Sequence, residues 1–212
     1  MSQQLTAEPI RFGWTSPERT QCHDFLLPAV DRALAPLRGR QPSARVFDIG
    51  CGNGIVAAHL HRQGFHVQGV DPAEDGIAQA RLAHPGLDLG PGSAYDDLAA
   101  EFGTFDAVVS LEVVEHLYFP HRFAQRAFEL LEPGGLLLLS TPYHGWLKNV
   151  LIAVAGKWDY HHHPLRDHGH IKFWSEPTLR TLLEGAGFRS IRFARLGRFP
   201  AVAKSVFVTA RR

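Results

Sequence analysis

Three closely spaced glycines follow an apolar stretch at 46–49 and form the first group of residues that suggests chemistry. They are Gly50, Gly52 and Gly54, and Asp71 ends the next apolar stretch. Glycine has no Cβ, so such a turn lets the backbone come close to a ligand. An acid at the end of the next strand stands where a pair of ribose hydroxyls is bound. The spacing predicts a site for a cofactor that contains a nucleoside. It is not the dinucleotide pattern, because Ile55 occupies the third glycine position, and the loop has no Walker lysine for a nucleoside triphosphate.

A second group combines two carboxylates and an imidazole, namely Glu112, Glu115 and His116. Two carboxylates suit Mg²⁺ or a similar hard ion. A metal held there would lower the pKa of a hydroxyl bound to it by direct ligation. The alternative is that no ion binds and that Glu115 or His116 only shapes the mouth of the pocket.

Six histidines lie between positions 144 and 170, and a neutral imidazole is a suitable base for a hydroxyl at physiological pH. His144 follows an apolar stretch that ends at the carboxyl edge of the predicted sheet, where ligands bind. We expect one of three histidines, His144, His168 or His170, to be the base. The other histidines of this interval are expected to be exposed loop residues. The adjacent histidines at 161–163 have poor geometry for a zinc site.

These residues are carried by alternating strands and helices. Apolar patterns and turn residues predict helices at 24–37, 53–63, 75–83, 120–131 and 176–184, and strands at 45–49, 66–70, 87–90, 105–110, 136–140, 189–195 and 203–210. Such alternation predicts an α/β fold with a mostly parallel sheet covered by helices. The length of 212 residues is that of a single domain, which we place over 1–212.

Two segments stand apart from this alternation. In the N-terminal arm and helix at 1–40, Phe12 and Trp14 either fold over the cofactor site or merely pack the arm down. The interval 142–174 is too long for a simple connection, so we interpret it as a substrate cap. Its apolar stretch 146–155 is too short to span a bilayer. The stretch lies on a membrane surface, covers a lipophilic substrate or packs on the core.

The composition indicates a globular protein, with 45% apolar and 20% charged residues. A formal net charge of +1 argues against a nucleic-acid partner. Cys22 and Cys51 give no disulfide framework, which favours a cytoplasmic location, and Cys51 is best explained as a small buried filler. We expect no signal peptide and no transmembrane segment. The oligomeric state is left open.

The stretch Asp48–Gly54 resembles motif I of the class I S-adenosylmethionine-dependent methyltransferases. The resemblance extends to 70–72, 105–110 and 131–136, in the same order. It implies a Rossmann-like, doubly wound sheet of seven strands whose last strand is antiparallel, with S-adenosylmethionine as the cofactor. The residues that it implies for cofactor binding are Asp48, Gly50, Cys51, Gly52, Gly54, Asp71, Pro72, Ser93, Ala94 and Leu111. Relatives often carry an acid near 93–94, and Ser93 stands in its place here.

The stretch Glu112–His116 resembles the ubiquinone-biosynthesis O-methyltransferases, whose matching residues can hold a divalent ion. His168 and His170 match segments that face the site in these relatives. The stretch 140–143 is similar to the Pro-Pro-Tyr motif of base-amino methyltransferases, but it follows a different strand. The resemblance implies O-methylation of a small-molecule hydroxyl, on a quinone-like phenol or another metabolite. The alternatives are N- or C-methylation of a small metabolite, or a cofactor-binding partner subunit without turnover. Methylation of nucleic acid is less expected.

Overall fold

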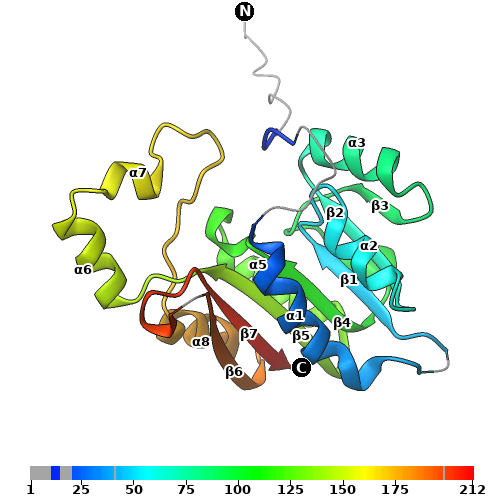
Figure 1. The fold of residues 1–212 in the computed structure, drawn as a ribbon. Coiled ribbons are helices and arrows are strands. Elements are labelled where there is room, and N and C mark those ends of the chain that lie inside the picture. Colours follow the sequence, from blue (N-terminus) through cyan, green and yellow to red (C-terminus); the bar gives the residue numbers. More distant parts are fainter. Residues whose placement is uncertain (1–10, 15–20, 41, 198) are drawn as a thin grey trace, which may run out of the picture.

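A seven-stranded sheet forms the centre of the protein in the computed structural model, which describes residues 11–14, 21–40, 42–197 and 199–212. The strands are β1 (Arg45–Ile49), β2 (His66–Asp71), β3 (Asp88–Pro91), β4 (Phe105–Leu111), β5 (Leu131–Pro142), β6 (Arg189–Leu196) and β7 (Ser205–Arg211). Their order is β3-β2-β1-β4-β5-β7-β6 (Figure 1). The first five strands pair in parallel, whereas β7 runs antiparallel to both β5 and β6. The predicted sheet, with its antiparallel last strand, is confirmed.

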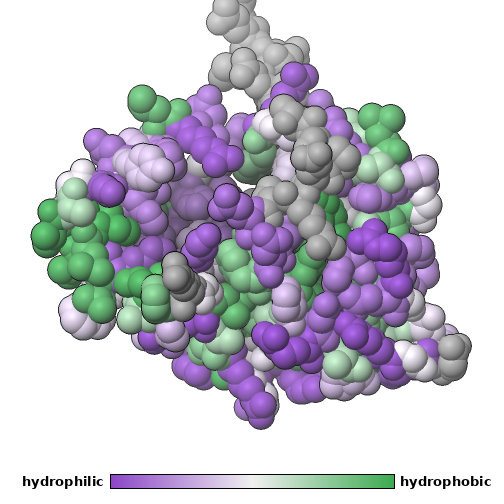
Figure 2. All heavy atoms as spheres, in the orientation of Figure 1, coloured by the Kyte–Doolittle hydropathy of each residue, from purple (hydrophilic) through white to green (hydrophobic). Residues whose placement is uncertain are grey.

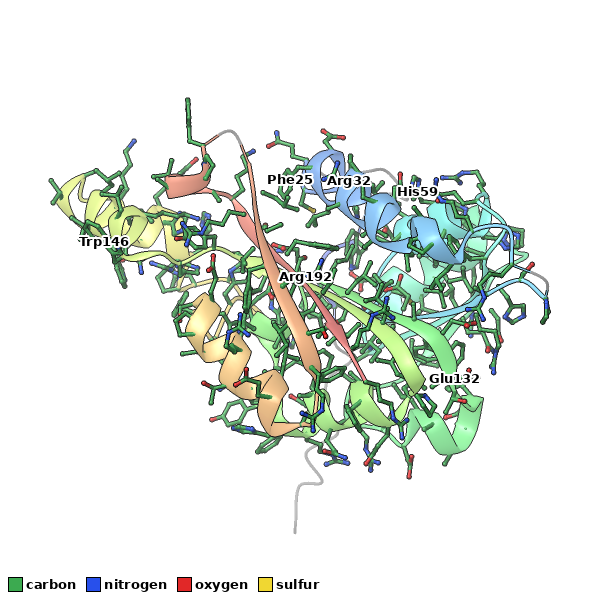
Figure 3. The ribbon with its side chains drawn as sticks, turned by 90° about the horizontal axis from the view of Figure 1, so that it is seen from below. Phe25, Arg32, His59, Glu132, Trp146 and Arg192 are labelled. Atoms are coloured by element: carbon green, nitrogen blue, oxygen red, sulfur yellow. The ribbon has the colours of Figure 1, made fainter. Side chains whose placement is uncertain are left out.

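Helices cover both faces of the sheet. One layer contains α1 (His23–Leu34), α2 (Ile55–His61) and α3 (Glu74–Ala83), and the other contains α4 (Leu98–Phe102), α5 (Pro120–Glu129) and α8 (Glu176–Gly185). Figure 3 shows α1 and α8 on opposite sides of the sheet. Successive side chains of a strand point to opposite faces, so Phe47 joins the core under α5 and Val46 the core under α2. The apolar strands are therefore buried on both sides, as a doubly wound fold requires.

The boundaries of several elements differ from those predicted, and the largest shift is at the start of β5. Strand β5 begins at Leu131 and not at 136, and α5 ends at Glu129. Leu131 pairs with Phe105, and the register then shifts before Leu136 pairs with Ala107. The glycines at 134 and 135 thus lie in an irregular part of the strand. Helix α8 begins as predicted, because Ser175 caps it by accepting a hydrogen bond from the Thr178 N–H at 3.4 Å.

The interval 142–174 contains two helices, α6 (Trp146–Val154) and α7 (Trp158–His162). They lie beside the sheet and not on its faces (Figure 1). None of the nine residues of α6 is buried, and the helix contacts α7 and the short 3-10 turn Pro200–Val202. The alternative that this stretch packs on the core is therefore wrong. In the ranges that the structure describes, no helix is both long and apolar enough to cross a membrane.

Candidate active site

The glycine loop lies at the carboxyl end of β1 and leads into α2. Gly50, Gly52 and Gly54 have φ angles of +81°, +51° and +78°, in the left-handed region that favours glycine. A Cβ on Gly50 would come within 2.4 Å of the Val113 side chain, so a larger residue does not fit. The Gly50 N–H donates to the Val70 carbonyl at 2.8 Å, which fixes the loop to the end of β2. The loop therefore presents backbone to any ligand above it.

Asp71 ends β2 and holds the loop from the other side. Its Oδ2 accepts the Gly52 N–H at 2.9 Å, and its Oδ1 accepts the Ala73 N–H at 2.8 Å. Burial raises the pKa of this carboxyl, and the two backbone N–H groups act against that rise. A carboxylate offers about four lone-pair sites, so about two remain for the hydroxyls of a ribose. Pro72, the next residue, is exposed.

Asp48 lies beneath the loop, in β1, and is 2% exposed. Its Oδ2 has no hydrogen-bond partner among the described residues. Burial, and then the charge of Asp71, raise the pKa of Asp48 to about 7. A buried carboxylate oxygen without a partner is costly, and a cationic group would relieve that cost. The open backbone of the loop, the free lone pairs of Asp71 and this oxygen together fit the amino acid and ribose of S-adenosylmethionine.

The remaining residues predicted to bind the cofactor lie along the same edge of the sheet. Burial raises the pKa of the Cys51 thiol well above its ordinary value, which agrees with a filler and not a reactive group. The loop after β3 carries Ser93, whose Oγ accepts the Tyr95 N–H at 3.2 Å, and Ala94, which is buried. Leu111 ends β4 and is half-buried. The structure thus brings the residues predicted to bind the cofactor to the carboxyl ends of four adjacent strands, the position where such sheets bind ligands.

A cluster of three titratable side chains lies next to this edge. Glu115, His116 and His170 each offer one ligand atom, and these atoms lie within 4.8 Å of one another. Glu115 and His116 belong to a 3-10 turn after β4, Val114–His116. The chain returning from the cap binds this turn, because the backbone N–H groups of Ile171 and Lys172 both donate to the Glu115 carbonyl at 3.0 Å. That return brings in His170.

Burial controls the charge of the cluster. Glu115 is 1% exposed, and neither of its carboxyl oxygens has a partner in the part of the chain that the structure describes. Burial, and then Glu112, raise the pKa of Glu115. Burial lowers the pKa of His116, and it lowers that of His170 to about 4, although 37% of the His170 side chain is exposed. Both imidazoles are therefore neutral at physiological pH, with the His170 Nε2 lying 4.0 Å from a Glu115 oxygen.

The tautomer of His116 follows from its neighbours. Its Nδ1 lies 2.8 Å from the His168 carbonyl oxygen, which can only accept, so Nδ1 carries the hydrogen. The lone pair is then on Nε2, where the ring can accept a proton or bind a metal ion. His168 itself is exposed and has a φ of +55°. In this arrangement His168 contributes its carbonyl to the site.

Glu112 is not part of the three-residue cluster. Its Oε1 accepts the hydroxyl hydrogen of Ser140 at 2.8 Å, and its φ of +57° is unusual for a residue other than glycine. Burial raises the pKa of Glu112 to about 7, and the hydrogen bond with Ser140 acts in the opposite direction. The ligand set predicted from sequence was Glu112, Glu115 and His116. The structure groups Glu115 and His116 with His170 in place of Glu112.

His144 lies in a second, adjoining group on the cap side. Its ring is 5.8 Å from that of His161 and 5.7 Å from that of His162, between ring centroids. Burial lowers the pKa of His144 to about 4. Of the three predicted bases, only His170 joins Glu115. No sequence signal marked that pair, because its members are far apart in the chain.

Comparisons with known proteins identify the family of the chain. A family model described as a methyltransferase domain matches residues 19–192. The ubiquinone biosynthesis O-methyltransferase of Caulobacter sp. (strain K31) is 35% identical over 153 residues, which are 69% of this chain and 61% of that protein. The enzyme of the same name from Azorhizobium caulinodans is 34% identical over 168 residues, covering 77% of this chain and 64% of that protein. The chain thus spans about three fifths of the length of these relatives.

Solved structures share the fold at lower identity. Magnesium protoporphyrin IX methyltransferase from Synechocystis PCC 6803 with bound SAH has a TM-score of 0.67 and 23% identity, covering 88% of this chain and 82% of that one. A SAM-dependent methyltransferase from Archaeoglobus fulgidus has a TM-score of 0.63 and 18% identity, covering 90% and 97%. The family model covers most of the chain, and the relatives exceed 30% identity over more than two thirds of it. The chain belongs to the methyltransferase domain family.

Proposed function

We propose that the protein transfers the methyl group of S-adenosylmethionine to the oxygen of a small-molecule hydroxyl, foremost a quinone-like phenol. The observation that carries this proposal is the cluster of Glu115, His116 and His170, whose turn follows Val113, the residue that faces Gly50 of the glycine loop. A sulfonium already contains an activated leaving group. The protein therefore has to hold the two reactants in line and to accept the proton of the hydroxyl.

The donor would be held by the glycine loop, by Asp71 at its ribose and by Asp48 near its ammonium. S-adenosylmethionine supplies an electrophilic methyl group on sulfur. The chain's own residues orient it, because Asp71 fixes Gly52 and leaves lone pairs towards the ligand. A bound ammonium would also give the orphaned Asp48 oxygen its partner.

The proton of the acceptor hydroxyl would pass to an imidazole Nε2 as the oxygen–carbon bond forms and the carbon–sulfur bond breaks. His116 is oriented for this role, because its Nδ1 donates to the His168 carbonyl. His170 is the other candidate, with Glu115 4.0 Å away. Burial raises the pKa of Glu115 and lowers that of His170, so both groups are uncharged at neutral pH before the acceptor binds.

A divalent ion is the alternative way to activate the hydroxyl. The unpartnered, buried oxygens of Glu115 and two imidazole nitrogens fit a cation. This donor set of one oxygen and two nitrogens suits a transition ion such as Zn²⁺ or Mn²⁺ better than Mg²⁺, which prefers oxygen ligands. An ion held there would lower the pKa of the acceptor hydroxyl.

The cap supports an acceptor with an apolar part. A hollow of about 310 Å³ between α6, α7 and the turn at 200–202 is lined by Leu151, Ile152, Ala155, Tyr160 and Val202, with Lys148, Lys157 and His161. Relatives at 35% and 32% identity are named for ubiquinone biosynthesis. The balanced net charge of +1 gives no support to a nucleic-acid substrate.

The test measures methyl transfer to catechol, and the S-adenosylhomocysteine that is released gives the rate. His116→Ala and His170→Ala should each lower kcat by about 10²-fold, the usual scale of a general base, with donor affinity within about twofold. His121→Ala is the matched control, because His121 is an exposed histidine on α5. Loss of activity in EDTA and recovery with Zn²⁺ would select the metal-bound version. Full rates in both variants, or transfer to amines and not to hydroxyls, would contradict the proposal.

A further inference from the structure

Residues 11–14, which we call the strap, are fixed to the first turn of α3. The backbone N–H groups of Gly13 and Trp14 both donate to Asp75 Oδ2 at 2.8 Å, and that of Phe12 donates to Asp75 Oδ1 at 3.4 Å. Three consecutive amides thus share one carboxylate, and hydrogen bonds to a charged acceptor are stronger than those between neutral groups. Asp75 holds a segment that lies more than sixty residues earlier in the chain.

The indole of Trp14 lies against the middle of the glycine loop. A Cβ built on Gly52 would come within 2.9 Å of Trp14 Cζ2, and one on Gly76 within 3.1 Å of Trp14 Cδ1. Each is closer than ordinary van der Waals contact, so the ring lies directly on the backbone of both glycines. The absence of a side chain at Gly52 therefore leaves room for Trp14, in addition to allowing the left-handed turn.

The other end of the strap reaches the histidines. The Phe12 ring lies 5.5 Å from the His116 ring in an edge-on arrangement, and 5.5 Å from the ring of His168, between ring centroids. Aromatic rings at this distance and angle attract one another. Four residues therefore connect the loop beside Asp71 with the cluster beside Glu115, so the strap lies across the junction of the two parts of the site.

We propose that Asp75, acting through the strap, is a positioning residue for the methyl donor, and that Trp14 is a contact residue that retains the donor on the glycine loop. Only this donor part of the proposed function is needed. The indole covers Gly52 and forms an apolar roof at the edge of the donor site, which removes water from a charged ligand bound beside the ring and strengthens that ligand's contacts with the loop. An aromatic face also attracts a cation, and the donor carries a sulfonium. Phe12 extends the same roof to His116.

This role differs from that of a segment that only stabilises the fold. A structural segment would change thermal stability and leave the donor's residence time unchanged. A donor roof acts chiefly on the dissociation rate, because the donor leaves only after the roof opens. Substitutions of Asp75 and Trp14 should also be non-additive, since Asp75 anchors the strap that carries the Trp14 ring.

The experiment measures S-adenosylhomocysteine binding by calorimetry and its release by stopped flow, in the full-length protein. Asp75→Ala and Trp14→Ala should each raise Kd by about tenfold, mostly through faster release, and the double variant should be little worse than either single variant. Glu74→Ala is the matched control, because Glu74 is an exposed acid in the same helical turn. It should bind like the wild type. Asp75→Asn keeps one acceptor oxygen and should recover part of the affinity.

Thermal unfolding of each variant is measured alongside binding. Wild-type affinity and release in both Asp75→Ala and Trp14→Ala would overturn the proposal. It would also be overturned if Asp75→Ala lowered Tm while release from the folded fraction stayed the same. If the wild type itself failed to bind S-adenosylhomocysteine, the assignment of the donor would be wrong, which is a different result from an inactive strap.

Discussion

The donor side and the acceptor side of the site are built in different ways. The donor side comes from two adjacent parallel strands, where Asp48 pairs with Gly69 and Ile49 with Val70, and from the turns that follow them. The acceptor side joins a 3-10 turn after β4 to a segment that returns from the cap more than fifty residues later. The first is set by local backbone geometry and regular pairing. The second exists only when distant segments meet, so it has greater freedom to change with the acceptor.

The largest effect should come from the residue that joins the two strands of the donor side. Asp71→Ala removes the acceptor of the Gly52 and Ala73 N–H groups as well as the proposed contact with the ribose. We expect the affinity for S-adenosylhomocysteine to fall by at least about 100-fold, since two hydrogen bonds to a charged group contribute about 3 kcal/mol or more. Calorimetry measures this, and Tm should fall too because the loop loses its anchor.

Asp88→Ala is the control for that substitution. Asp88 lies on the neighbouring strand β3, is exposed and bonds through its carboxylate to the Gln68 side chain. It should leave donor affinity unchanged. Equal affinities of Asp71→Ala and the wild type would show that the ribose is held elsewhere, and the contrast between an anchored donor side and an assembled acceptor side would fail.

The two sides also differ in how well sequence predicts them. Gly50, Gly52 and Gly54 were identifiable because a left-handed turn needs glycine, and Asp71 because alternation placed it at a strand end. The pairing of Glu115 with His170 was not predictable, because it depends on backbone N–H groups at 171 and 172 reaching a carbonyl far away in the chain. The sharing of Asp75 by three amides of the strap left no pattern at all. Neighbouring residues determine local backbone geometry, but they do not show which distant segments of the chain come into contact.

Strand β5 shows the same limit within the sheet. The glycines at 134 and 135 predict a turn before the strand, yet pairing begins at Leu131, because its partner Phe105 lies in register on β4. In the cap, the apolar stretch at 146–155 has a clear composition but not a clear partner. Composition identifies apolar side chains, but only the fold shows whether they are buried.

An intermediate effect is expected at Asp48, and it depends on pH. The pKa of Asp48 in the folded protein is about 7, above the ordinary 3.8, because the carboxyl is buried. Between these values the folded protein binds more protons than the unfolded chain, so stability falls as pH rises. Asp48→Asn should therefore raise Tm at pH 8 by about 4 °C, and less at pH 5, since the neutral amide has no charge to bury.

The same substitution should weaken S-adenosylhomocysteine binding by about tenfold, because the ammonium of the ligand loses a charged partner. Thermal unfolding at pH 5 and pH 8 measures the first effect, and calorimetry the second. Asp88→Asn, at an exposed position, should change neither. A variant that is less stable than the wild type at pH 8 would show that the Asp48 carboxylate already has a partner within the fold, and the donor side would then lack a place for the ammonium.

The smallest effect on stability is expected in the cap. Trp146 and Val154 are 77% and 82% exposed, and Figure 2 shows apolar side chains gathered at the end of the molecule formed by the cap. Trp146 lies at the opposite end of the molecule from Glu132 (Figure 3). Trp146→Ser and Val154→Ser should shift Tm by no more than about 1–2 °C, because an exposed side chain loses little on truncation. Donor affinity should stay at the wild-type value.

What these two variants change instead shows what the apolar face of α6 contacts. If the face lies on a membrane, binding to phospholipid vesicles should fall several-fold. Burial of apolar surface in lipid contributes about 25 cal/mol per Å² to the binding free energy, and each substitution removes part of that surface. If the face covers the acceptor, vesicle binding stays the same and the KM for the acceptor rises. Leu82→Ser is the control, since Leu82 is 79% exposed on α3, away from the cap. Equal losses in Leu82→Ser and the cap variants would mean that vesicle binding reflects general surface hydrophobicity. The acceptor side would then have no membrane contact of its own, and its apolar residues would have to be explained by the substrate alone.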